Sequence, residues 1–252
     1  MSNTRVIILA AGKGTRMKSD IPKPLIPVAG KPMVEHLLES VRASGVDAHP
    51  IVVIGMWSEA AFRAQLGDTV DYAIQNEQLG TGHAVACAKV SAGSADRIIV
   101  LYGDHPFVRP EVIKGIADMH EAFSDSIVML TAIVPDFTGE HEHFIKWGRI
   151  LRDDDGEVIG IREAKECIPE ELDITEINPG IYSFPAAWAW SHLDKLKNEN
   201  ASSEYYLTDL IAMAVAEGKE IATASADPFD VIGINSPEEL ARAERVFRQN
   251  KT

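Results

Sequence analysis

Cationic side chains surround two glycines near the start of the chain. The apolar run Val6–Leu9 leads into Gly12-Lys13-Gly14, and Arg16 follows shortly after. Glycine lets a backbone approach a phosphate and present N–H groups to it, while lysine and arginine add charged donors. A loop that follows a strand at the carboxyl edge of a sheet lies where α/β folds bind ligands. The residue types therefore indicate phosphate binding; the alternative is a solvated loop with ordinary surface cations.

This glycine loop matches neither of the two common phosphate-binding patterns. A Walker loop requires GxxxxGK[ST], whereas here Lys13 lies between the glycines. A dinucleotide fingerprint requires GxGxxG, whereas its last position is occupied by Met17. Lys23 follows between Pro22 and Pro24, which stiffen the chain around it. From these residues alone, Lys23 fits a phosphate contact and a surface turn equally well.

One acidic residue is placed to hold a metal ion. Asp104 comes just after the apolar run Ile98–Leu101, so its carboxylate should emerge at the carboxyl edge of a sheet. Mg²⁺ is often held by one carboxylate together with substrate phosphates, although a lone aspartate is also a common helix cap or loop residue. A second pattern, His141 and His143 in the polar segment Asp136–Lys146, lacks a third ligand. We expect those histidines to be solvated.

Apolar runs alternate with helical patterns along the chain. This alternation predicts an α/β fold with a Rossmann-like, mixed but mostly parallel sheet and helices on both faces. The expected strands are Val6–Leu9, Ile51–Ile54, Val70–Ile74, Ile98–Leu101, Ser126–Val134, Arg149–Leu151, Glu157–Ile161, Ile177–Phe184 and Val231–Ile234. The expected helices are Pro32–Ala43, Thr81–Val90, Pro110–Met119, Ala186–Leu196, Leu207–Glu217 and Ser236–Phe247, and residues 136–147 are expected to form a loop.

Length, composition and charge restrict the class of protein. The 252 residues, 46% of them hydrophobic, are expected to form a single domain, with a nucleotide-binding half of about residues 1–105 and a second half of about 106–252. The net charge of −14 argues against nucleic acid or an anionic membrane as partner. Cys87 and Cys167 form no paired motif, and no signal peptide or membrane span is evident. We therefore expect a cytoplasmic protein.

Several motifs in a fixed order connect the opening loop to a known family. The string Leu9–Met17 with Pro22-Lys23-Pro24 resembles the signature of the sugar-1-phosphate nucleotidyltransferases, in particular the uridylyltransferase domains of bacterial N-acetylglucosamine-1-phosphate uridyltransferases. The resemblance covers nearly the whole chain. Its further motifs are Gln75–Ala84, Tyr102-Gly103-Asp104, Gly148-Arg149-Ile150, Glu163, Asn178-Pro179-Gly180, Glu204–Asp209 and Gly233-Ile234-Asn235.

The resemblance implies a reaction, UTP plus a sugar 1-phosphate giving a UDP-sugar and pyrophosphate, with Mg²⁺ as cofactor held by Asp104 and Asn235. It implies catalytic roles for Lys13, Arg16, Lys23 and Asp104. The residues implied to bind the nucleotide are Leu9, Ala10, Ala11, Gly12, Gly14, Thr15, Gln75, Gly80, Thr81 and Gly103. Those implied to bind the sugar are Gly148, Glu163, Asn178, Tyr205 and Thr208.

Some residues depart from the family pattern. Trp147 stands where many relatives have Tyr, Pro179 follows Asn178 where Thr or Ser is frequent, and the segment Asp136–Lys146 is longer than usual. These changes leave the sugar open, with N-acetylglucosamine 1-phosphate favoured. The alternatives are a dTTP- or CTP-dependent enzyme of the same superfamily and a non-catalytic sugar-nucleotide sensor. No hexapeptide repeat is present, so acetyltransferase activity is not expected, and the oligomeric state is left open.

Overall fold

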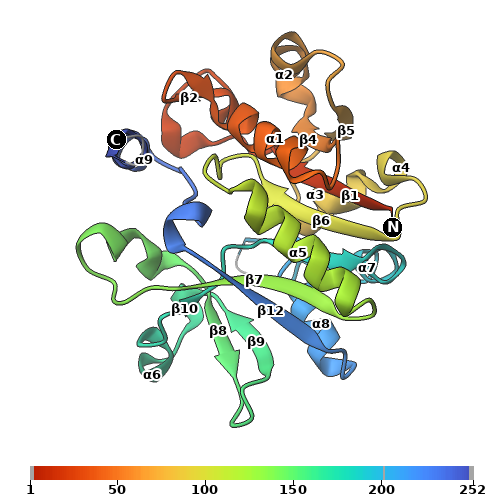
Figure 1. Ribbon diagram of the computed structural model, residues 1–252, viewed down its shortest axis with the longest axis vertical. Helices are drawn as coiled ribbons and strands as arrows, with labels where there is room; N and C mark the ends of the chain where they lie inside the picture. The colour runs from red at the N-terminus through yellow and green to blue at the C-terminus, as the bar shows by residue number, and fades with distance from the viewer. Residues whose placement is uncertain (1–2, 201, 250–252) are drawn as a thin grey trace.

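The fold is built on one mixed, ten-stranded sheet with the strand order β5-β4-β1-β6-β11-β7-β10-β8-β9, in which β12 also pairs with β7. The computed structural model describes residues 3–200 and 202–249 (Figure 1). The strands are β1 (Thr4–Leu9), β4 (Ile51–Gly55), β5 (Asp71–Gln75), β6 (Arg97–Tyr102), β7 (Ile127–Ile133), β8 (Arg149–Arg152), β9 (Val158–Arg162), β10 (Glu176–Ile177), β11 (Tyr182–Pro185) and β12 (Ile221–Ala226). A separate hairpin joins β2 (Pro27–Val28) to β3 (Lys31–Pro32).

The first half of the sheet is parallel throughout. β1 lies between β4 and β6, and β4 pairs with β5. The chain therefore builds strands outward on one side of β1 and then returns to place β6 on its other side. In open α/β sheets, ligands bind at the carboxyl ends of the strands where the strand order reverses in this way. That point lies between Leu9 and Tyr102, which are paired in register.

The second half of the sheet mixes directions. β11 runs antiparallel to both β6 and β7, while β12 runs parallel to β7 over Ile221–Ala226. β10, β8 and β9 extend the sheet by antiparallel pairing. This region lies at the bottom of Figure 1.

Helices cover both faces of the sheet, as alternate strand residues require. In β1, Val6 and Ile8 belong to one core cluster and Ile7 and Leu9 to the other. The first face is covered by α1 (Met33–Ser44), α2 (Glu59–Leu66) and α5 (Pro110–Ala122), and the second by α3 (Thr81–Cys87), α7 (Ala186–Leu193) and α8 (Asp209–Ala216). The other helices are α4 (Lys89–Ala92), α6 (Pro169–Leu172) and α9 (Pro237–Gln249).

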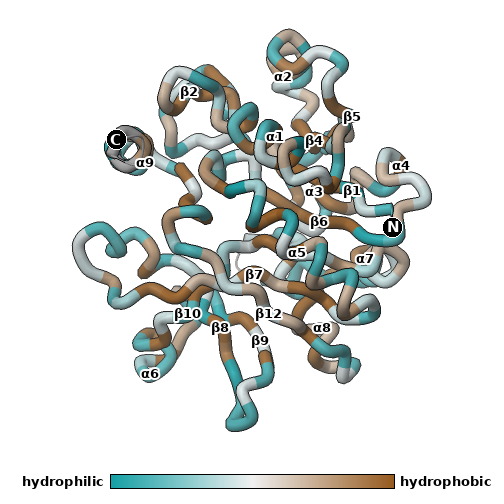
Figure 2. The backbone as a smooth tube through the Cα atoms, in the orientation of Figure 1, coloured by the Kyte–Doolittle hydropathy of each residue, from teal (hydrophilic) through white to brown (hydrophobic). Residues whose placement is uncertain are grey.

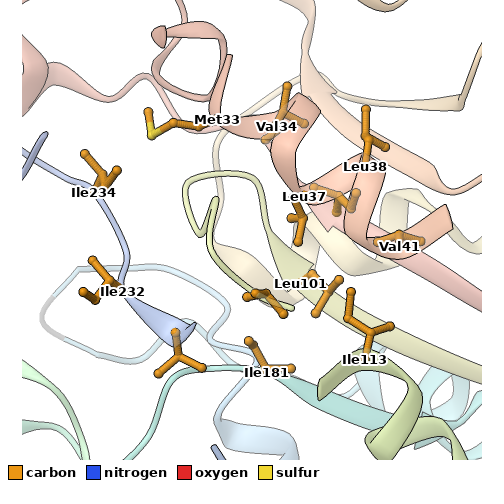
Figure 3. Packing of buried hydrophobic residues seen from close by; sticks show 14 of the residues in the cluster. Met33, Val34, Leu37, Leu38, Val41, Leu101, Ile113, Ile181, Ile232 and Ile234 are labelled. Carbon is orange, nitrogen blue, oxygen red and sulfur yellow. The ribbon is translucent and has the colours of Figure 1, made fainter. Parts of the chain in front are cut away.

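The buried strands run as hydrophobic bands through the middle of the molecule (Figure 2). Close up, Leu37 of α1 lies near Leu101 at the end of β6, and both belong to the first core cluster (Figure 3). This packing holds the ends of β1 and β6 in a fixed position beneath the loops that follow them. The expected fold class is confirmed by this mixed sheet with helices on both faces.

Three of the expected elements are wrong. The single strand expected over Ile177–Phe184 is split into β10 and β11, because Pro179 lacks an N–H and Gly180 has a φ of +81°. The apolar run Val231–Ile234 is buried but is not a strand; Val231 ends the 3₁₀ turn Pro228–Val231, and the Ile234 N–H donates to the Asp104 carbonyl. The helix expected over Thr81–Val90 is interrupted at Ala88.

Two further segments differ from the expectation. The last strand of the sheet is β12, an alanine-rich run that the sequence pattern did not indicate. The expected loop over residues 136–147 contains a 3₁₀ turn at Gly139–Lys146. In the part of the chain that the structure describes, no helix combines the length and apolar character needed to cross a membrane.

Candidate functional site

Two adjoining cavities open at the carboxyl ends of β1 and β6. The first, of about 220 Å³, is lined by the Leu9–Gly12 backbone, by Lys23 and by Gln75 with Gly80. The second, of about 310 Å³, is lined by residues of the sheet's second half, including Gly148, Glu163 and Asn178. Three residues line both cavities: Thr81, Tyr102 and Asp104. The site therefore has two compartments with Asp104 at their junction.

The loops after β1 and β6 approach each other closely. The Gly103 N–H donates to the Leu9 carbonyl at 2.9 Å, and a Cβ at Gly103 would lie only 3.2 Å from Cβ of Pro24. Gly14 makes a similar approach, because a Cβ there would lie 2.6 Å from Cβ of Lys23. The glycines of the opening loop thus pack its backbone against the stem of Lys23.

Four polar residues, Arg16, Lys23, Asp104 and Asn235, form one hydrogen-bonded cluster at this junction. Nζ of Lys23 donates to a carboxylate oxygen of Asp104 and, at 2.9 Å, to Oδ1 of Asn235. The same Asn235 oxygen accepts from Arg16 Nη2 at 2.9 Å. The side chains of Lys23 and Asp104 are only 15% and 12% exposed, so the pair is largely withdrawn from water.

Burial works against ionisation of Asp104, yet the balance favours the charged form. Desolvation alone would raise its pKa, but the charge of Lys23, the neighbouring His105 and the hydrogen bond from Lys23 together hold the Asp104 pKa below its usual value. Asp104 is therefore a carboxylate at neutral pH. An anionic oxygen and a neutral amide oxygen converge here on one cation.

The start of α9 holds Asn235 in place. The Asn235 N–H donates to Oε2 of Glu239 at 2.6 Å, and the Glu239 N–H donates to Oγ of Ser236 at 3.2 Å. The Ile234 N–H bonds the Asp104 carbonyl at 3.0 Å. These contacts hold the Gly233-Ile234-Asn235 segment against the loop that follows β6.

The far end of the first cavity is organised by Gln75. Its side chain belongs to a residue only 3% exposed, and its amide nitrogen is hydrogen-bonded to the Gly80 carbonyl at 3.1 Å and to Nδ1 of His83 at 3.0 Å. The Gln75 side-chain oxygen makes no hydrogen bond to the residues that the structure describes, which leaves it able to accept one from a ligand. The cavity wall here thus presents one fixed acceptor.

The Gly80 loop is held against residues 204–206. The Tyr205 N–H donates to the Leu79 carbonyl at 2.7 Å, and the Gly82 N–H donates to the Tyr205 carbonyl at 2.8 Å. Gly80 itself has a φ of +107°, and a Cβ there would lie 2.6 Å from the Tyr205 carbonyl oxygen. The two segments therefore form one wall that runs between the cavities.

The second cavity contains the amide group of Asn178 and the carboxyl group of Glu163, both available to a ligand. Oδ1 of Asn178 accepts from the Gly180 N–H and from the Tyr182 hydroxyl, each at 2.9 Å, so the amide nitrogen of Asn178 is the group left for a ligand. Burial, followed by repulsion from Glu166, raises the pKa of Glu163. Glu163 therefore keeps its proton to a higher pH than a solvated glutamate.

The structure places most of the expected site residues on these walls. Gly12, Gln75, Gly80, Thr81, Gly148, Glu163, Asn178 and Thr208 line one or both cavities, together with Leu9, Ala10, Ala11, Lys23, Asp104 and Asn235. Gly14 and Gly103 line neither cavity; they allow the loops after β1 and β6 to pack closely against Lys23 and Pro24. Lys13, Thr15 and Arg16 are exposed on the rim, where Arg16 reaches Asn235.

Tyr205 differs from the expectation. Its ring packs against the second core cluster, and its backbone rather than its side chain forms the wall; the neighbouring Tyr206 lines the second cavity instead. His105 was not anticipated as a site residue, although it also lines this cavity and directly follows Asp104. Nothing in the residue types around position 105 indicates that its ring points into the site.

The histidine-rich segment makes protein contacts instead of being solvated. Nδ1 of His143 accepts from Arg242 of α9 at 2.9 Å, and burial followed by the Arg242 charge lowers the His143 pKa to about 4. Across the described ranges 3–200 and 202–249, no group of three or more His, Cys, Asp or Glu residues could hold a metal ion. Cys87 and Cys167 are free thiols.

The fold is of the α/β type, and its two-compartment site lies at the carboxyl ends of β1 and β6. The chain belongs to the family described as the MobA-like NTP transferase domain, whose model matches residues 6–201. This match agrees with the resemblance expected from the motifs.

The chain is also similar to curated proteins named bifunctional protein GlmU. It is 41% identical over 243 residues to that of Clostridium novyi (strain NT), an alignment that covers 96% of this chain and 52% of the relative. It is 42% identical over 245 residues to that of Exiguobacterium sp. (strain ATCC BAA-1283 / AT1b), which covers 96% of this chain and 52% of the relative. The chain thus spans about half the length of these relatives.

Two solved structures share the fold at low sequence identity. A Bacillus anthracis protein assigned as a glucose-1-phosphate thymidylyltransferase, crystallised with sucrose, gives a TM-score of 0.77 at 20% identity and covers 97% of this chain and 95% of that chain. A CMP:2-keto-3-deoxy-manno-octonic acid synthetase complexed with CTP gives a TM-score of 0.72 at 18% identity and covers 99% of this chain and 100% of that chain. At these identities the likeness concerns the fold alone.

Proposed function

We propose that this protein is a nucleotidyltransferase that forms UDP-N-acetylglucosamine and pyrophosphate from UTP and N-acetylglucosamine 1-phosphate. One observation carries the proposal: the Lys23–Asp104–Asn235 cluster lies where the two cavities join. A nucleoside triphosphate in the first cavity and a sugar phosphate in the second would bring their phosphates together at this cluster. The similarity to bifunctional protein GlmU over nearly the whole chain supports the choice of substrates.

The reaction needs no covalent intermediate with the protein. An oxygen of the sugar phosphate attacks the α-phosphorus of UTP in line, the bond between the α-phosphorus and its bridging oxygen breaks, and pyrophosphate departs with the electron pair of that bond. The sugar phosphate is already an anion, so no base is required to activate it. The protein contributes positioning and stabilisation of the charge that shifts toward the leaving group.

The cations of the opening loop match this distribution of charge. Lys13 and Arg16 lie on the exposed rim, where they would contact the β- and γ-phosphates and stabilise departing pyrophosphate. Lys23 is buried deeper, at the junction, and would lie beside the α-phosphate. Gly12 and Gly14 keep the backbone low enough for phosphates to approach its N–H groups.

The residues at the junction also fit a divalent cation. Asp104 and Asn235 each direct one oxygen at the Lys23 ammonium, so this pair of oxygens can share a single cation once Lys23 moves aside. Asp104 and Asn235 would hold Mg²⁺ there, which would supply positive charge for the phosphates. Lys23, displaced from Asp104, would then be free to contact the α-phosphate.

Each compartment offers groups suited to its proposed ligand. The free side-chain oxygen of Gln75 can accept the N3–H of uracil, a donor that cytosine lacks. In the second cavity, the amide nitrogen of Asn178 can donate to the acetamido carbonyl, and Glu163 can bond a sugar hydroxyl. A ligand that leaves such a buried group unpaired loses about 1–3 kcal/mol, which corresponds to about fivefold to 150-fold in discrimination.

A pyrophosphate-release assay with Mg²⁺ tests the proposal directly. UTP, dTTP and CTP are each paired with N-acetylglucosamine 1-phosphate and glucose 1-phosphate, and kcat/KM is compared across the six pairs. We expect UTP with N-acetylglucosamine 1-phosphate to exceed every other pair by about tenfold or more. A higher value with dTTP or CTP would reassign the nucleotide. Binding of UDP-N-acetylglucosamine without release from any pair would show a sensor instead of an enzyme.

A further inference from the structure

The side-chain amide of Gln75 is held by two acceptors, both on its nitrogen. Nε2 of Gln75 lies 3.1 Å from the Gly80 carbonyl oxygen, which can only accept a hydrogen bond, so the amide atom that faces it is the nitrogen. The same nitrogen lies 3.0 Å from Nδ1 of His83. An amide nitrogen carries two hydrogens, so both are used within the protein. The side-chain oxygen of Gln75 is the atom left for a ligand.

These contacts determine which nitrogen of the His83 ring carries the hydrogen. Because Gln75 donates to Nδ1 of His83, that nitrogen is an acceptor, and the ring hydrogen lies on Nε2. Nε2 lies 3.9 Å from Sγ of Cys87, one helical turn further along α3, and sulfur is a weak acceptor that suits this N–H. His83 therefore faces Gln75 as an acceptor.

His83 can affect a nucleotide only through Gln75. Gln75 lines the first cavity, whereas His83 is not among the described residues that line either cavity. Turning the Gln75 amide over would bring its oxygen against the Gly80 carbonyl oxygen and against the lone pair of His83 Nδ1. Two hydrogen bonds would become two repulsive contacts. The Gly80 carbonyl belongs to the backbone, so His83 is the part of this restraint that a side chain supplies.

We propose that His83 is a positioning residue that favours uracil over cytosine by keeping the oxygen of the Gln75 amide toward the base. Uracil carries a hydrogen on N3, which an amide oxygen accepts, whereas N3 of cytosine is an acceptor and requires an amide N–H. An amide released from His83 turns more easily and can meet either base. This inference rests on the proposed function and adds to nucleotide recognition a residue outside the cavity.

Two substitutions at position 83 separate the acceptor from the rest of the side chain. Asparagine and leucine branch at the same carbon and both lack the ring, but only asparagine places an acceptor oxygen where Nδ1 of His83 lies. Isothermal titration calorimetry of the intact protein measures Kd for UTP, dTTP and CTP. In His83→Leu, Kd should rise by about fivefold or more for UTP and dTTP, which both carry N3–H, and by less than about twofold for CTP. His83→Asn should keep the ratio of UTP to CTP affinity within about twofold of the unsubstituted protein.

The ratio of affinities distinguishes positioning from a general structural role, because a structural defect weakens all three nucleotides by the same factor. An unchanged ratio of UTP to CTP affinity in His83→Leu would overturn the inference. So would loss of the UTP preference in His83→Asn, or equal affinity of the unsubstituted protein for UTP and CTP.

A measurement on the unsubstituted protein decides the question even if neither variant folds. With ¹⁵N in the histidines and in the glutamine side chains, an N–H···N hydrogen bond gives a scalar coupling between its two nitrogens in nuclear magnetic resonance spectra. We expect this coupling between Nε2 of Gln75 and Nδ1 of His83. A missing coupling, or a hydrogen on Nδ1 of His83, would contradict the assignment.

The binding and release assays separate this inference from the proposed function. Pyrophosphate release, with an unchanged ratio of UTP to CTP affinity in His83→Leu, would remove His83 from base selection and leave the nucleotidyltransferase in place. A UTP preference in binding that His83→Leu abolishes, without release from any substrate pair, would support the role of His83 and reject the reaction.

Discussion

Replacing Gly80 with alanine tests the wall between the two cavities. The residue has a φ of +107° and a ψ of 177°, a conformation essentially confined to glycine, which costs another residue about 1–3 kcal/mol. The new Cβ would also lie 2.6 Å from the Tyr205 carbonyl oxygen and 2.8 Å from its nitrogen. Overlap with backbone adds about 1–3 kcal/mol, because a backbone cannot rotate away as a flexible side chain can.

Together, backbone strain and steric overlap should lower the free energy of unfolding of Gly80→Ala by about 4 kcal/mol. In a protein of this size, each kcal/mol lowers Tm by about 2–4 °C, so Tm should fall by about 8–16 °C. Residues 204–206 must also move away from Gly80, and Glu204 lines the first cavity. We therefore expect the KM for UTP to rise by about tenfold or more, which corresponds to about 1.4 kcal/mol of binding.

Two other glycines serve as matched controls. Gly93 has a φ of +57° but open space at the Cβ position, so Gly93→Ala isolates backbone strain from overlap. Gly115, inside α5, has open space and an ordinary φ, so Gly115→Ala should raise stability by about 0.4–1 kcal/mol. Neither should change the KM for UTP. If Gly80→Ala loses no more stability than Gly93→Ala and keeps its KM, residues 204–206 do not form this wall.

Other perturbations address the junction and the core. Asp104→Ala should reduce turnover by about a thousandfold or more while the circular dichroism spectrum stays unchanged, because the change removes a proposed metal ligand at the carboxyl edge of the sheet. Near-normal turnover would remove Asp104 from the site. Lys23→Ala should lower kcat by about a hundredfold to a thousandfold, and an unchanged rate would reduce this residue to a turn lysine. Chelation with EDTA should stop pyrophosphate release, and added Mg²⁺ should restore it; release that survives chelation would rule out a required metal. His120 is buried against Ser183, and burial lowers its pKa from 6.5 to about 4. The unfolded chain therefore binds a proton that the folded protein excludes between about pH 6.5 and 4, so urea midpoints should fall as the pH falls through this window. His120→Asn should flatten that dependence; an identical slope would assign the loss to other groups.

The parallel half of the sheet could be predicted because its strands are buried on both faces. Val6–Leu9 and Ile98–Leu101 are continuous β-branched and aliphatic runs, which are typical of such strands. β12 has no comparable pattern, since its alanines are compatible with a helix or a strand. Its six residues pair with β7, so its conformation is set by the tertiary structure. The strand expected at Val231–Ile234 was wrong because apolar side chains indicate burial and not backbone pairing. These side chains are buried, but the Ile234 N–H donates to a carbonyl in a loop instead of a neighbouring strand.

The sequence motifs name the members of the candidate site, but the arrangement of their side chains could not be predicted from them. Family motifs indicated Lys23, Asp104 and Asn235 as members of one site, and the structure brings them into hydrogen-bond contact. The direct pairing of Lys23 with the proposed metal ligands was not foreseen, because motif roles describe the substrate-bound state. His105 escaped notice because the direction of a side chain after a strand depends on its neighbours, here Tyr102 and Trp147.

The ammonium group of Lys23 occupies the two oxygens, of Asp104 and Asn235, that would hold the proposed divalent cation. A cation that displaces Lys23 frees a positive charge for the nucleotide phosphates, and phosphates that draw Lys23 away free both oxygens for the cation. Binding of either species therefore strengthens binding of the other. Equilibrium linkage makes this effect reciprocal, so saturating UTP should tighten Mn²⁺ by the same factor by which saturating Mn²⁺ tightens UTP. In the absence of nucleotide, Lys23 serves as the counterion of Asp104, so we expect the proposed site to bind metal weakly.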